Sequence, residues 1–93
     1  MSGWEKVSLI QEVPAGSWSS VQVNCSAGKK PMGAAGWQWC GTSTCSVGNL
    51  GEPEWRIGSS LPLLGDVGWE LRAINDDPDF SVWIRAVLIC ATV

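Results

Sequence analysis

The chain breaks into short runs of alternating or β-branched residues, and glycine, proline, asparagine or aspartate separates each run from the next. No stretch keeps an apolar period of 3.6 residues over ten positions, as a helix that buries one face requires. The 11 glycines and 5 prolines are spread through the whole sequence, which leaves little room for long regular elements. The pattern therefore predicts an all-β fold, a small antiparallel β-sandwich or barrel of about six strands.

These strands are predicted to form a single domain over residues 1–93, because a chain of this length builds one core. The predicted strands are Trp4–Val13, Trp18–Cys25, Met32–Cys40, Glu54–Gly58, Trp69–Asn75 and Ser81–Ala91. Successive side chains point to opposite faces of a strand, so each strand has one apolar face that must be buried. In the last strand the second half is apolar on both faces, which predicts a central position in its sheet.

The four cysteines are predicted to form two disulfides that staple this small domain. Cys25 and Cys90 each close an apolar strand face, and a bridge between them would contribute about 4 kcal/mol in the chain-entropy model. Cys40 and Cys45 are close enough in sequence for a local bridge worth about 2 kcal/mol. Disulfides imply an oxidising compartment. A four-cysteine zinc site is the alternative, although structural zinc usually takes its ligands in two close pairs.

The absence of histidine weighs against catalysis, since no Ser–His or Cys–His nucleophile pair can be built. Glu52, Glu54 and Glu70 could supply the carboxylates of a glycoside hydrolase, but nothing in the sequence selects a pair. A net charge of −3 does not suit a duplex nucleic-acid binder, which needs a basic surface. No run reaches the ~18 apolar residues of a membrane span, and the first residues carry no apolar signal segment. We therefore expect no enzyme activity, no cofactor, no nucleic-acid partner and no membrane insertion.

Two loops resemble ligand-binding motifs without meeting their requirements. The glycine-rich run 28–36 lacks the Gly-Lys-Ser/Thr ending of a phosphate loop, so it is predicted to be a tight turn followed by a strand. The carboxylates of Asp76, Asp77 and Asp79 lack the spacing and the distal glutamate of an EF-hand. A solvated turn between two strands explains them, and calcium binding there stays open.

Tryptophan is the residue that points to a function, since the chain holds 7 tryptophans, 1 phenylalanine and no tyrosine. Trp69 shares an apolar strand face with leucine and alanine and is predicted to be core, whereas Trp4, Trp18 and Trp83 share their faces with polar residues. Indoles in such positions are expected to be covered by a ligand or a partner. The predicted ligand-binding residues are Trp18, Trp83, Trp4, Gln22, Asn24 and Arg85.

The leading hypothesis is a non-catalytic binding module, lectin-like or receptor-binding, whose partner is a glycan or a cell-surface receptor. The alternative is an assembly module, in which the domain forms a homo-oligomer, for instance a trimer, and caps a fibre or larger protein. Val87, Ile89 and Ala91, on the second face of the last strand, favour this alternative.

Between residues 21 and 91 the sequence also carries a spaced pattern of cysteine, glycine and tryptophan. Its parts are Val21–Lys30 with Cys25, then Gly33, Gly36, Pro62, Gly68-Trp69, Asn75 and Trp83–Ala86 running to Cys90. The pattern resembles the cysteine-bridged β domains at the C-terminal ends of bacterial, especially actinobacterial, collagen-like and secreted proteins and of some phage tail fibres. The resemblance implies a Cys25–Cys90 bridge, an extracellular or virion or cell-surface location, and oligomers. The Cys40/Cys45 pair and Ala34-Ala35, where more glycine is usual, depart from the pattern.

Overall fold

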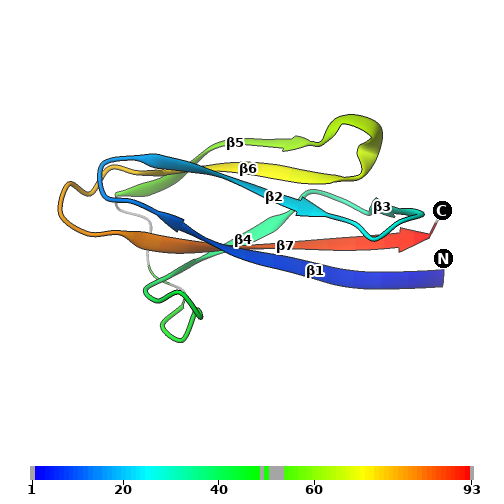
Figure 1. Cartoon of the computed structure of the whole chain (residues 1–93), viewed down its shortest axis with the longest axis horizontal. Coiled ribbons are helices and arrows are strands. Elements are labelled where there is room, and N and C mark those ends of the chain that lie inside the picture. The colour runs from blue at the N-terminus through cyan, green and yellow to red at the C-terminus, as the bar shows by residue number, and fades with distance from the viewer. Residues whose placement is uncertain (1, 49, 51–53, 93) are drawn as a thin grey trace.

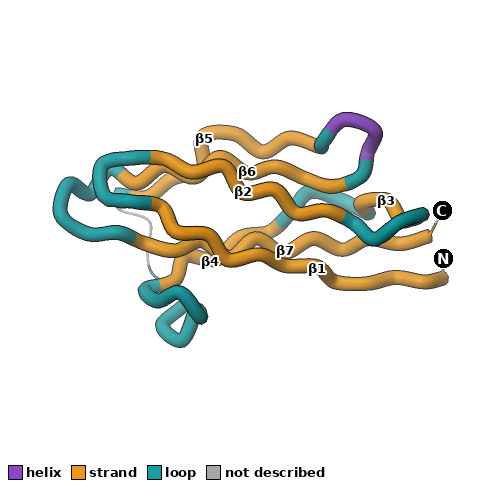
Figure 2. The backbone as a smooth tube through the Cα atoms, viewed as in Figure 1, coloured by secondary structure: helices purple, strands orange, loops and turns teal. Residues whose placement is uncertain are grey.

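The computed structural model, which describes residues 2–48, 50 and 54–92, consists of two antiparallel β-sheets packed face to face (Figure 1). The strands are β1 (Ser2–Val13), β2 (Trp18–Asn24), β3 (Lys29–Pro31), β4 (Gly36–Cys40), β5 (Trp55–Pro62), β6 (Gly68–Asn75) and β7 (Val82–Thr92). A single 3-10 turn, η1 (Leu64–Asp66), lies among the described residues between β5 and β6 (Figure 2). The prediction of an all-β sandwich is confirmed.

The strand β7 is the centre of the first sheet. β1 pairs along one edge of β7, and β3 and β4 share the other edge. The second sheet has the order β2–β6–β5, with β6 between its neighbours. The central position of the last strand, predicted from its two apolar faces, is confirmed.

Two strand predictions were wrong in their boundaries. Of the predicted strand Met32–Cys40 only the second half forms a strand, β4, and the short strand β3, which was not predicted, lies just before it. Between β3 and β4 the chain leaves the edge of β7, and Ala35 is buried. The described residues therefore contain seven strands. The strand predicted to end at Gly58 continues to Pro62, since this glycine occupies a bulge and does not break the pairing with β6.

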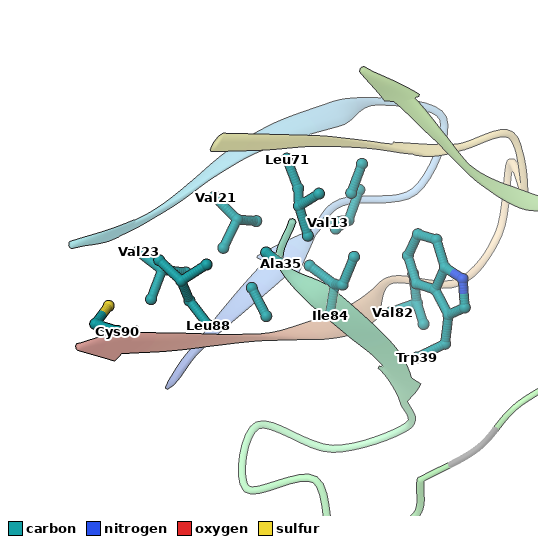
Figure 3. Close-up of a cluster of buried hydrophobic side chains, with 12 residues drawn as sticks. Val13, Val21, Val23, Ala35, Trp39, Leu71, Val82, Ile84, Leu88 and Cys90 are labelled. Carbon is teal, nitrogen blue, oxygen red and sulfur yellow. The ribbon is translucent and has the colours of Figure 1, made fainter. Parts of the chain in front are cut away.

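The core lies between the two sheets, where the predicted apolar faces meet (Figure 3). From the β2–β6–β5 sheet come Val21, Val23 and Leu71, and from β7 come Ile84 and Leu88, each 3% exposed or less. Trp39 of β4 fills one end of this core and packs against Trp55 of β5, with 5.9 Å between the ring centroids. Both sheets therefore contribute alternate residues to one continuous interior.

Among the residues that the structure describes, Asn75 is the polar side chain that is buried in this core, with 1% exposure. Its amide nitrogen donates to the carbonyl oxygens of Val13 (3.2 Å) and Phe80 (2.8 Å). Its amide oxygen accepts the backbone N–H of Asp77 at 2.9 Å. Asn75 therefore links the end of β1, the end of β6 and the connection to β7.

The glutamate Glu5 ties β1 to the turn that precedes β3. One carboxylate oxygen accepts the backbone N–H of Ser26 at 2.9 Å, and the other accepts its hydroxyl at 2.9 Å. The Lys29 ammonium lies 3.7 Å from the same carboxylate. These hydrogen bonds, and the Lys29 charge after them, lower the pKa of Glu5 below its ordinary value of 4.5.

Both predicted disulfides are present. Cys25–Cys90 joins the end of β2 to β7 across the two sheets, with 5.8 Å between the Cα atoms, and Cys40–Cys45 closes the loop after β4 with 4.9 Å. All four cysteines are thereby used, and the alternative of a four-cysteine zinc site is wrong. The disulfides indicate an oxidising environment. Across residues 2–48, 50 and 54–92 there is no helix of the length and hydrophobicity that a membrane crossing requires.

Candidate functional site

The structure divides the predicted ligand-binding residues between the two outer faces of the sandwich. Trp18, Gln22 and Asn24 lie on the outer face of the β2–β6–β5 sheet, since they alternate with the buried core residues of β2. Trp83, Arg85 and Trp4 lie on the outer face of the other sheet. Because the core separates these two groups, they cannot contribute to one site.

On the β2–β6–β5 sheet an exposed indole lies beside polar side chains that are bonded to one another. We call Trp18, Ser20, Gln22, Glu70 and Arg72 the polar–aromatic platform. Trp18 is 55% exposed, and the guanidinium carbon of Arg72 lies 4.6 Å from its ring centroid. The strand register places Ser20 opposite Arg72, so Arg72 reaches Trp18 along the diagonal. This cation–π contact limits the orientations that the indole can adopt.

The carboxylate of Glu70 organises the rest of the platform. One of its oxygens accepts hydrogen bonds from the Ser20 hydroxyl and from the Gln22 amide, both at 2.9 Å. The Gln22 bond, and after it the Ser20 bond, lowers the pKa of Glu70, with a further contribution from the charge of Arg72. The platform therefore presents an ionised carboxylate and a guanidinium side by side. Asn24 is exposed at the end of the same strand face.

The outer face of the opposite sheet is more apolar. Trp4 is 66% exposed and Ile89 40% exposed, while Ile10 and Val87 are half-buried. We call these four residues the apolar outer face. Trp83 and Arg85 are half-buried on the same side of β7.

A groove that sequence reasoning did not find lies between the turn regions of the two sheets. Its volume is about 440 Å³, and its walls include Lys30, Pro31, Ala34, Pro62, Asp66 and Trp69. We call it the Trp69 groove. In Figure 1, β3 lies beneath the turn that connects β5 to β6. Residues of both segments line the groove. Trp69, predicted to be core, is half-buried and forms part of this wall.

Two hydrogen bonds hold the walls of the Trp69 groove in position. The indole N–H of Trp69 donates to the Ser60 hydroxyl at 2.7 Å, which orients the ring. The Lys30 ammonium donates to the carbonyl oxygen of Gly65 at 2.9 Å, across the gap between the sheets. In the sequence, Lys30 and Ala34 lie in the glycine-rich run, and Pro62 and Asp66 follow about thirty positions later, so nothing in the sequence shows that they lie together.

The carboxylates considered for calcium form a structured turn. The side chain of Asp77 accepts the backbone N–H of Asp79 at 2.9 Å and of Phe80 at 3.2 Å. The bond from Asp79 is the main cause of the lowered pKa of Asp77. A side-chain hydrogen bond between Glu54 and Asp77, together with the negative charge of Asp77, raises the pKa of Glu54. Within the part of the chain that the structure describes, no group of three or more acidic, histidine or cysteine side chains is arranged to hold a metal ion.

The platform and the Trp69 groove have the same chemical character. Each offers indole carbon surface beside one acidic and one basic side chain, a combination that suits binding of an uncharged ligand with both apolar and hydroxyl groups. Comparison of the chain with protein-family models, with curated proteins and with solved structures finds no match, so the geometry of these surfaces is what points to a function.

Proposed function

We propose that this domain is a non-catalytic, lectin-like binding module that recognises carbohydrate on the polar–aromatic platform. The observation that carries the proposal is the 55% exposed Trp18, which is held beside polar side chains. Sugar rings present C–H faces that stack on an indole, and their hydroxyls donate to carboxylates and accept from guanidinium groups. Glu70 and Arg72 supply that acceptor and that donor.

The hydrogen bonds within the platform support the proposal energetically. Ser20 and Gln22 are both bonded to Glu70, and Arg72 is packed on Trp18, before any ligand arrives. Side chains that are already ordered lose little conformational entropy on binding, a cost of about 0.5–1.5 kcal/mol for each one that must be immobilised. A preorganised surface of this kind favours a polar ligand that gains only modest energy per contact.

The proposed location is the cell or virion surface, where the glycan of a receptor is accessible. The two disulfides support a compartment outside the reducing cytosol. The similarity of the cysteine, glycine and tryptophan pattern to domains at fibre tips agrees with such a place.

The test is a calorimetric titration with a panel of neutral oligosaccharides, using wild-type protein and Trp18→Ala. We expect the substitution to weaken binding at the platform about tenfold or more, as removal of a central aromatic anchor does. The matched control is Trp4→Ala, which removes an exposed indole from the opposite sheet and should leave the affinity unchanged. Equal affinities for Trp18→Ala and wild type would refute the platform.

A second function, self-assembly, is favoured by the apolar outer face. Trp4 and Ile89 are the exposed members of this face, and exposed apolar residues grouped in this way are typical of interaction surfaces. We propose that identical chains associate through it. Native mass spectrometry at micromolar concentration should then show an oligomer that Ile89→Glu dissociates. A wild-type monomer would exclude this assembly, and the carbohydrate proposal would stand, since the platform lies on the other sheet.

A further inference from the structure

We infer that the Trp69 groove is a second carbohydrate-binding site, which takes one unit of a neutral hexose chain independently of the platform. The inference rests on the proposed carbohydrate-binding function and extends it to a different part of the molecule. It also narrows the ligand class to uncharged sugars, as the polar groups of the groove indicate.

The groove has the size and the surface of a small-ligand site. Its volume of about 440 Å³ falls within the usual range for such sites, roughly 300–1,000 Å³. Two proline rings, Pro31 and Pro62, and the Trp69 indole provide carbon surface against which the C–H face of a pyranose ring can pack. Ala34, also on the wall, has a small side chain and so leaves room for a ligand in the Trp69 groove.

The indole of Trp69 distinguishes a sugar from a proline-rich peptide. Aromatic grooves also bind extended proline-rich segments, and a tryptophan N–H normally finds an acceptor, such as a peptide carbonyl. Here the Trp69 N–H already donates to Ser60 at 2.7 Å, so that donor is occupied. Stacking against a sugar needs the ring face alone. The bonded state of Trp69 therefore favours the sugar.

The charged groups of the groove favour a neutral sugar over an acidic or amino sugar. An ammonium group has three N–H donors, so the bond from Lys30 to Gly65 leaves it able to donate to a hydroxyl. Asp66, the residue after Gly65, offers a carboxylate acceptor on the same groove. A sugar carboxylate would be attracted by Lys30 but repelled by Asp66, and an amino group would be attracted by Asp66 but repelled by Lys30. A charged substituent therefore gains no net attraction that would offset its loss of hydration. Hydroxyl groups satisfy both Lys30 and Asp66.

The groove walls are held by the inter-sheet disulfide, which preorganises the site. Cys90 lies opposite Pro31 in the strand register, and Cys25 donates its backbone N–H to the carbonyl oxygen of Val67 at 2.7 Å. The bridge between the two cysteines therefore connects the β3 wall to the turn that carries Asp66. Little reorganisation is required when a ligand enters.

The experiment is a calorimetric titration of the whole protein with maltotetraose, cellotetraose and mannotetraose, and with a proline decapeptide. We expect at least one tetrasaccharide to bind wild type at two sites per chain. Ala34→Leu fills the groove from an exposed position and should abolish one site. Asp66→Asn should weaken that site about tenfold. Asparagine also tolerates the left-handed backbone at this position, where φ is 54°. Asp79→Asn, on the distant turn, is the matched control and should bind as wild type does.

The outcomes separate the two sites. Loss of one site in Trp18→Ala and of the other in Ala34→Leu supports both proposals. Wild-type binding by Ala34→Leu and Asp66→Asn overturns the groove alone, whereas wild-type binding by Trp18→Ala overturns the platform alone. If the proline decapeptide binds and Ala34→Leu abolishes that binding, the sugar assignment of the groove is wrong. If wild type binds none of the tetrasaccharides, the platform proposal and the groove proposal are both wrong. Circular dichroism and thermal melts of each variant verify that it folds.

Discussion

Replacement of Asn75 by alanine should destabilise this domain more than any other single polar-to-alanine change on the described strands. The amide makes three hydrogen bonds, to Val13, to Phe80 and from Asp77. A hydrogen bond contributes about 1 kcal/mol net to stability, so Asn75→Ala should cost about 3 kcal/mol. For a domain of this length, that loss lowers the melting temperature by roughly 12–24 °C.

The near-isosteric change Asn75→Asp tests whether the direction of these bonds matters. The new oxygen would face the carbonyl oxygens of Val13 and Phe80, where the amide nitrogen now donates, so the loss at neutral pH should exceed that of alanine. Burial, together with the two carbonyl oxygens that face the new oxygen, raises the pKa of this carboxyl above its unfolded value, although the other oxygen keeps the Asp77 N–H as a donor. The variant therefore binds more protons when folded, and its deficit relative to wild type should shrink as the pH falls towards about 4.

The assay is urea unfolding followed by tryptophan fluorescence at several pH values. With a urea dependence of about 1–3 kcal/mol per molar, a loss of 3 kcal/mol moves the midpoint by roughly 1–3 M. Asn24→Ala, at an exposed position on β2, is the control and should stay within about 0.5 kcal/mol of wild type. If Asn75→Ala unfolds at the wild-type midpoint, the three bonds do not stabilise the fold and this reasoning is wrong.

Three further predictions concern a disulfide, a glycine and a carboxylate. Joint replacement of Cys25 and Cys90 by serine should cost about 4 kcal/mol, read from the urea midpoint, since a loop of 65 residues is released in the unfolded chain. Gly68→Ala should cost about 1–3 kcal/mol in the same assay, because a Cβ there would overlap the carbonyl oxygen of Val23. In the wild type the lowered pKa of Glu5 contributes stability above pH 4.5, and Glu5→Gln should lose that contribution. The difference in urea midpoint between the variant and wild type should therefore close as the pH falls below 4.5.

Each of these predictions has a matched control. Replacing Cys40 and Cys45 opens a loop of only five residues and should cost about 2 kcal/mol, and an equal cost for both pairs would contradict the loop-length argument. Gly33→Ala meets open space and should be close to neutral, so a similar loss at both glycines would count against the steric explanation. Glu12→Gln, on the other face of β1, is the control for removal of a glutamate charge from this strand, and a loss of stability equal to that of Glu5→Gln would contradict the assignment.

The strand pattern and the Cys25–Cys90 disulfide could be predicted because they depend on local alternation, and the Cys40–Cys45 disulfide because its two cysteines are close in sequence. Val21, Val23 and Cys25 alternate with polar residues over a few positions, so parity alone identifies the buried face. The same reasoning erred at Gly58, where a glycine was taken as a strand end. Whether a glycine ends a strand or occupies a bulge depends on the partner strand, here β6, which local sequence does not contain.

The candidate sites were predicted only in part, for a related reason. Parity identified Trp18 and Gln22 as outward-facing, but Glu70 and Arg72, which complete the platform, come from a strand about fifty positions away. Trp69 shows the reverse error. It faces inward as predicted, yet the neighbouring walls do not close over it, and it lines a groove.

The amino-acid sequence by itself determined which side of each strand is apolar, since the alternation of side chains is a property of the extended backbone. It also determined that the four cysteines could staple the domain. Only the tertiary structure decided which outward-facing residues are neighbours, because strands distant in sequence pair through backbone hydrogen bonds that carry no residue identity. For that reason Trp18 and Trp83, which both share a strand face with polar residues, lie on opposite faces of the molecule. For the same reason the turns around Lys30 and Asp66 line one groove.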